Sequence, residues 1–313
     1  MRSTPMQPQP RLSASANLRQ VRGLLSPQWR PNAYLPGSST LYGQFWMGQS
    51  LWRPSALWAA VAGLIAGDAL GVLQSIHWQE LALLCLLVDL LWGAIWRLSG
   101  GRDHLLPLRS QPGAVQVRLP YLQPDSPAAQ LFRWNTADVW PWLLRVALPA
   151  VIVALLVAAT MGKVALILTF CVTLLTATGW VMRRNFGLPP ALCQALVTIA
   201  LPWLLALWRH GITPQHALWN VNLTLLALWT LHHWGEGRMT CLQNDWLGLV
   251  LLALSDIGLL LLMAAERLPL WLAVLTFLML PTWITILRYR SVQRLTFWWW
   301  MTMILSALAL SQA

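Results

Sequence analysis

The chain has 313 residues, of which 57% are apolar and only 10% are charged. An ordinary soluble domain carries roughly 25% charged residues, so this composition excludes a soluble globular protein and predicts a surface that faces lipid. The formal net charge of +11 comes from short segments between apolar runs, which favours orientation in a bilayer over nucleic-acid binding. The 22 tryptophans fit this setting, because indole rings favour the membrane–water interface.

Two regions are expected along the chain. Residues 1–50 are rich in Pro, Ser, Gln and Arg, which predicts a mostly disordered cytoplasmic lead. Residues 51–313 contain nine apolar runs, each near the roughly 20 residues that a spanning helix needs. These runs cover residues 55–75, 78–97, 139–161, 163–182, 190–209, 215–233, 246–265, 268–287 and 295–313. None alternates as a strand would, so we expect an all-α bundle of nine transmembrane helices.

The basic residues predict how this bundle is oriented. The lead and segments 98–138, 183–189, 234–245 and 288–294 hold most of the arginines, whereas the alternate segments hold little beyond Lys163, Arg209 and Arg267. Basic residues gather on the cytoplasmic side of membrane proteins. We therefore expect a cytoplasmic N-terminus and an external C-terminus, in an integral protein of the bacterial cytoplasmic membrane.

Two predicted cytoplasmic segments carry the clustered charges. The stretch "WGAIWRLSGGRDHLLPLR" (92–109) begins the long loop at 98–138, and "HHWGEGRMTCL" (232–242) begins the segment before residue 246. With "LWRPSALWAAVAGLIAGDALG" (51–71) and "LRYRSVQRLTFWWWMTMILSALAL" (287–310), they resemble, in the same order, the UbiA family of intramembrane prenyltransferases. The nearest likeness is to its chlorophyll synthase branch.

The resemblance implies transfer of a polyprenyl group from its diphosphate to an aromatic or tetrapyrrole acceptor. It implies that Asp103 and Glu236 act in catalysis and hold Mg²⁺. It further implies a substrate-binding set at the cytoplasmic ends of the helices, which comprises Arg97, Arg102, Arg109, Arg238, Asp89 and Asp245. The family's aspartate-rich motifs are here reduced to scattered carboxylates, although Mg²⁺ is usually held by carboxylate and phosphate oxygens.

A second hypothesis therefore stays open. The same fold could lack catalysis and bind a pigment, a quinone or an isoprenoid, or act as a subunit of a membrane complex. The arginines then anchor the helix ends, and the loop carboxylates are solvated and pair with neighbouring arginines.

Ionisable residues inside the apolar runs are the remaining candidates. Asp68, Asp89 and Asp256 are costly in a membrane, so each either serves a functional site or makes a hydrogen bond that fixes helix packing. His232 and His233 are adjacent, and neighbouring helical residues point about 100° apart. We expect these histidines at the cytoplasmic interface rather than on one metal ion.

Overall fold

The computed structural model describes residues 55–67, 78–96, 147–182, 190–209, 212, 214–216, 218–241, 245–287 and 295–312. The predicted lead at 1–50 and the long loop at 98–138 lie outside these residues. Within the described residues every regular element is a helix, as the apolar runs predicted.

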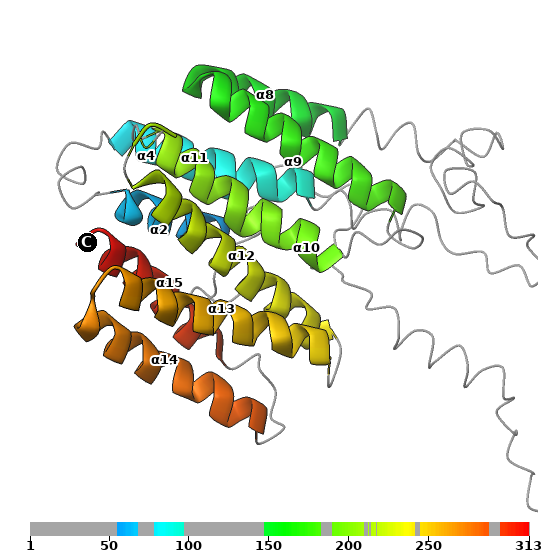
Figure 1. Cartoon of the computed structure of the whole chain (residues 1–313). Helices are drawn as coiled ribbons and strands as arrows, with labels where there is room; N and C mark the ends of the chain where they lie inside the picture. The colour runs from blue at the N-terminus through cyan, green and yellow to red at the C-terminus, as the bar shows by residue number, and fades with distance from the viewer. Residues whose placement is uncertain are drawn as a thin grey trace, which may run out of the picture.

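Nine helical rods run side by side in the described part of the chain (Figure 1). They are α2 (Ala56–Ala66), α4 (Trp78–Cys85) continuing through η1 (Leu86–Leu91) to Trp96, α8 (Leu148–Met161), α9 (Lys163–Met182), α10 (Pro190–Ala195) continuing through η4 (Leu196–Ala200) into α11 (Leu201–Arg209), α12 (Trp219–Cys241), α13 (Trp246–Ala265), α14 (Pro269–Leu287) and α15 (Thr296–Leu310). The predicted bounds 163–182, 190–209 and 246–265 agree with the structure. The segments η1 and η4 are π-helical, which the apolar runs did not predict.

The sixth rod differs most from its prediction. The expected helix ended at residue 233, with residues 234–245 as a loop, whereas α12 continues to Cys241. Gly235 lies so close to α13 that a Cβ atom there would be 2.9 Å from the carbonyl oxygen of Gly248. Small residues at such positions allow close approach of membrane helices, so these glycines serve packing and do not end the helix.

Four of the described rods are long and apolar enough to cross a membrane: Trp78–Trp96, Ala191–Arg209, Trp246–Ala265 and Pro269–Leu287. Large apolar side chains point outward from them, including Leu261 on α13 and Phe277 on α14. Exposed side chains of this kind suit contact with lipid. The prediction of a membrane protein built of transmembrane helices is thus supported.

The rods alternate in direction, which gives the bundle two distinct ends. At one end Arg209 donates hydrogen bonds to the carbonyl oxygen of Met161, at 3.2 Å, and to Glu80, at 2.9 Å. The rod that ends at Arg209 begins at the opposite end, where Ala191 packs against Gly237 of α12. The rod Trp78–Trp96 begins at the Arg209 end, where Glu80 lies. Its last residue, Trp96, therefore lies at the opposite end, with Gly237.

We call this second end the polar-loop end and define it by Trp96, Ala147, Cys241 and Asp245. The described helices that precede the two polar segments end there at Trp96 and Cys241, and the described chain resumes at Ala147 and Asp245. It lies at the right of Figure 1, opposite the marked C-terminus. Both predicted polar segments are therefore attached at the same end of the bundle.

Candidate functional site

The helix α12 is the most polar rod and lies within the bundle. It packs against α13, α10, η4, α15 and α2. Its last turns carry His232, His233, Glu236 and Arg238. Ionisable residues inside a membrane bundle mark a functional site by default, so α12 is the natural centre of a candidate site.

His233 and Glu236 form a buried pair on α12. The Nδ1 atom of His233 lies 2.8 Å from Oε2 of Glu236, and the glutamate is 0% exposed. The spacing of three residues places the two side chains on one helix face. The expectation of a solvated loop carboxylate at Glu236 is therefore wrong, because α12 continues through this residue and carries it into the bundle.

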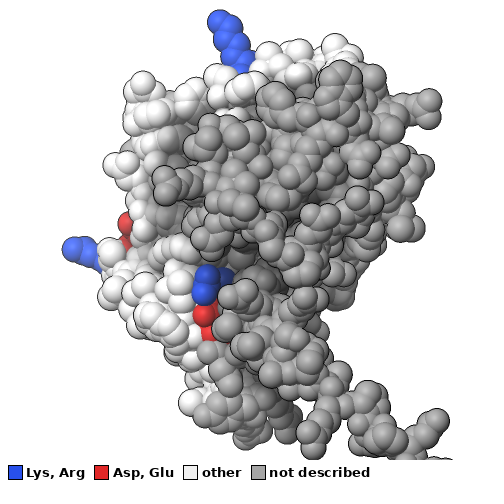
Figure 2. Space-filling model, turned by 90° about the vertical axis from the view of Figure 1, so that its right-hand side faces the viewer, with Lys and Arg blue, Asp and Glu red and all other residues white. Residues whose placement is uncertain are grey.

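Arg238 and Asp245 form a second pair at the polar-loop end. Nε and Nη2 of Arg238 donate to Oδ2 and Oδ1 of Asp245 at 2.6 and 3.0 Å, the bidentate geometry typical of arginine and carboxylate. Oδ2 also accepts a hydrogen bond from the backbone N–H of Gly248, which makes Asp245 the N-cap of α13. Figure 2 shows this end of the bundle, where a basic and an acidic group touch near the middle of the view.

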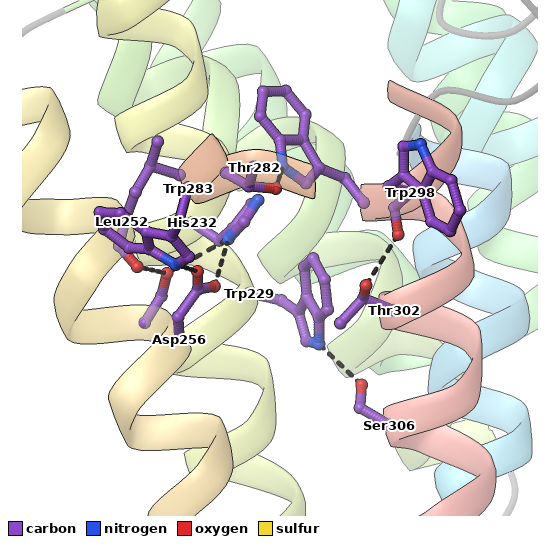
Figure 3. Close-up of polar contacts among 11 residues, drawn as sticks. Trp229, His232, Leu252, Asp256, Thr282, Trp283, Trp298, Thr302 and Ser306 are labelled. Carbon is purple, nitrogen blue, oxygen red and sulfur yellow. Dashed lines mark hydrogen bonds and ion pairs between the residues drawn. The ribbon is translucent and has the colours of Figure 1, made fainter. Parts of the chain in front are cut away.

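His232 is held by α13 in a separate polar cluster (Figure 3). Its Nδ1 atom lies 3.2 Å from Oγ of Ser255 and 3.4 Å from Oδ1 of Asp256. The other oxygen of Asp256 accepts a hydrogen bond of 2.9 Å from Nε1 of Trp283 on α14. The cluster therefore joins three helices through one carboxylate.

Tryptophan rings enclose this histidine. The centroids of the Trp229 and Trp299 rings lie 5.0 and 5.3 Å from the imidazole centroid. Each indole is fixed by its own hydrogen bond, from Trp229 to Ser306 and from Trp299 to Thr282, both at 2.9 Å. His232 and His233 are thus buried among the helices, at 3% and 4% exposure.

Asp89 and Asp256, two aspartates of the apolar runs, differ in their surroundings. Asp256 contacts His232 on α12 and Trp283 on α14, which agrees with the alternative that such an aspartate fixes helix packing. Asp89 lies buried in the π-helical segment η1, and its Oδ1 accepts no hydrogen bond from the described residues.

The remaining predicted site residues lie outside the described residues. These are Arg97, Arg102, Asp103, Arg109 and, in the first apolar run, Asp68. Of the predicted substrate set, the structure brings Arg238 and Asp245 together. The predicted catalytic and metal-binding Glu236 lies on α12, two residues before Arg238. Sequence reasoning missed the contacts of His232 with Ser255, Asp256 and the two indoles. Only the aspartate at 256, in the middle of an apolar run, signalled this cluster.

The described carboxylates at the polar-loop end do not fit a Mg²⁺ site. Both oxygens of Asp245 accept hydrogen bonds from Arg238, and Glu236 is paired with His233 inside the bundle. No group of three potential metal ligands occurs among the residues that the structure describes. Mg²⁺ prefers several hard oxygen ligands in octahedral geometry, which these paired carboxylates do not present.

Comparison of this chain with protein-family models, with curated proteins and with solved structures found no match.

Proposed function

We propose that this chain is a UbiA-like protein of the bacterial cytoplasmic membrane that binds an isoprenoid, a quinone or a pigment, or acts as a subunit of a membrane complex, without transferring prenyl groups. This proposal rests on the observation that the ionisable residues of the second polar segment, residues 232–245, pair with one another. Glu236 is paired with His233, and Asp245 with Arg238 and the start of α13. The resemblance to UbiA enzymes would give Glu236 a metal and Arg238 and Asp245 a substrate, whereas in this bundle the three side chains are occupied by contacts within the protein.

The tryptophans support binding of a flat hydrophobic molecule. Indole rings have apolar faces for stacking and an N–H group that gives orientation. Trp58 and Trp300 are in contact at the polar-loop end, with ring centroids 4.9 Å apart. Bilayer lipid is the other partner of this proposal, at the exposed apolar faces of α9, α13 and α14.

The second candidate is a divergent prenyltransferase acting on an aromatic or tetrapyrrole acceptor. The observation in its favour is that the helices before the two polar segments end at Trp96 and Cys241 at the same end of the bundle. A shared site between two polar segments requires this arrangement. Such an enzyme must stabilise the charge of the departing diphosphate, for which arginines of residues 97–109 would be the available donors.

A transfer assay separates the two functions. Purified full-length protein is incubated with labelled polyprenyl diphosphates and aromatic or tetrapyrrole acceptors, with and without Mg²⁺. We expect no prenylated product, together with quinone, pigment or isoprenoid that copurifies with the protein. Product that forms with the wild type and is lost in both Asp103→Asn and Arg109→Ala would overturn the binding proposal and establish the transferase.

Thiol labelling tests the proposed orientation. The variants Ser110→Cys, Asn244→Cys and Gln215→Cys are made in a parent whose four native cysteines are replaced by serine. In intact cells a membrane-impermeant maleimide should label Cys only at position 215, because the polar-loop end is proposed to face the cytoplasm. Lysed cells, where all three positions should react, are the control. Labelling of positions 110 and 244 from outside would reverse the orientation, and different sides for these two positions would contradict the fold.

A further inference from the structure

The His232 cluster has an unused hydrogen-bonding group. Nε2 of His232 is buried and has no hydrogen-bond partner in the described part of the chain. The histidine as a whole is 3% exposed. Buried polar atoms are normally paired, so an unpaired ring nitrogen enclosed by fixed side chains calls for a physical reason.

The hydrogen bonds around the ring determine which nitrogen carries the proton. The Ser255 hydroxyl donates its single hydrogen to the carbonyl oxygen of Leu252, at 2.8 Å. Towards His232 it can therefore only accept, so Nδ1 must be the N–H group that faces Ser255 and the carboxylate of Asp256. The neutral ring consequently carries its lone pair on Nε2.

A carboxylate and two indole rings face the imidazole of His232. Asp256 supplies a carboxylate 3.4 Å from Nδ1, and Trp283 holds that carboxylate in place through its indole N–H. Both neighbouring indole centroids lie within roughly 6 Å of the imidazole centroid, with interplanar angles of 50° for Trp229 and 80° for Trp299. The carboxylate of Asp256 and two indole rings are therefore the groups that surround the imidazole.

We propose that His232 and Asp256 form a proton-binding site inside the membrane bundle, with Nε2 of His232 as the atom that takes up the proton. Uptake of one proton from water forms one N–H bond and breaks none in the protein. It changes the ring charge from zero to +1 opposite the Asp256 carboxylate. Because Nε2 has almost no exposed surface, a proton is the ligand that fits without displacing a side chain.

Few other titratable groups surround the site. On α12 these are His233 and Glu236, which pair with each other, Arg238, which pairs with Asp245, and Cys241. The helix α13 contributes Asp256, and α10, which also packs against α12, contributes Cys193. The helices α2, α14 and α15 contain no titratable side chain at all. Asp256 is therefore the charged group that faces His232 most closely. The proton site goes beyond the proposed ligand-binding function and does not depend on it.

Nitrogen NMR of the intact chain in lipid nanodiscs tests the proposal. The protein is labelled with ¹⁵N-histidine, and the His232 signals are those absent from His232→Gln. We expect Nδ1 to remain protonated throughout the titration, while Nε2 changes from a bare nitrogen to N–H as the pH is lowered. A bare Nδ1 at high pH, or an Nε2 that stays bare at every pH at which the protein remains folded, would overturn the proposal.

Two aspartate variants provide the matched comparison. Asp256→Asn should lower the pH midpoint of the Nε2 signal by about one unit or more, because the facing negative charge is lost. Asp245→Asn makes the same chemical change at the start of α13 and should leave the midpoint unchanged. An unchanged midpoint in Asp256→Asn would contradict the pairing, and if this variant does not fold, the wild-type titration decides by itself.

Discussion

Replacing Glu236 with alanine is expected to lower the free energy of unfolding by about 3–5 kcal/mol, the cost of breaking a buried pair by removing one partner. The carboxyl is fully buried, and its loss leaves Nδ1 of His233 facing a cavity inside the bundle. Equilibrium unfolding in mixed detergent micelles, followed by circular dichroism, measures the change. Glu236→Gln should recover most of the stability, since the amide keeps the size and a hydrogen-bond acceptor.

Glu80→Ala is the control for this prediction. Glu80 pairs with Arg209 at the opposite end of the bundle, and its side chain is 47% exposed. An exposed pair contributes about 0–1 kcal/mol, so this variant should remain close to the wild type. Equal stability of Glu236→Ala and Glu80→Ala would contradict a structural role for Glu236 and restore its candidacy as a catalytic or metal-binding carboxylate.

The second large effect is expected at the contact between α12 and α13. In Gly235→Ala the new methyl group would meet the Gly248 carbonyl oxygen at 2.9 Å and the Leu252 backbone nitrogen at 3.1 Å. Backbone atoms cannot rotate away, so the helices must separate, at a cost of about 1–3 kcal/mol. The same unfolding measurement should show this loss, together with a lower thermal transition of the purified protein.

Gly258→Ala is the matched substitution on α13. The added methyl group there meets the terminal methyl group of Leu228, a flexible side chain that can change rotamer. Alanine also restricts the unfolded chain more than glycine does, which favours the folded state by about 0.4–1 kcal/mol. We expect this variant to be neutral or slightly stabilising. Losses of similar size at both positions would show that the close approach at Gly235 has no special importance.

Most of the fold followed from local properties of the sequence. Runs of about 20 apolar residues have one stable form in lipid, which is the helix. Gly162, which has a φ of 108°, separates α8 from α9, and Arg267, which has a φ of 57°, lies between α13 and α14. Breaks of this kind can be recognised from the sequence alone, which explains why the bounds of α9, α13 and the α10–α11 rod were predicted closely.

The polar part of α12 could not be read in the same way. A stretch such as Gly235-Glu236-Gly237-Arg238 looks like a loop, because glycines and charges usually end an apolar helix. In the bundle the glycines face Gly248 and Ala191, and the charges find partners on α12 and at the start of α13. Contact with another helix reversed the local preference. The π-helical segments η1 and η4 were not predicted either. A single wide turn barely changes the spacing of apolar residues, so the sequence pattern does not reveal it.

Hydropathy was therefore sufficient to predict a bundle of apolar helices, because the cost of exposing backbone groups to lipid depends on each residue separately. The partners of His232, Glu236 and Asp245 were decided only in three dimensions. Hydrogen bonds and ion pairs act over about 3 Å, and residues 24 positions apart, such as His232 and Asp256, come that close only when two helices pack.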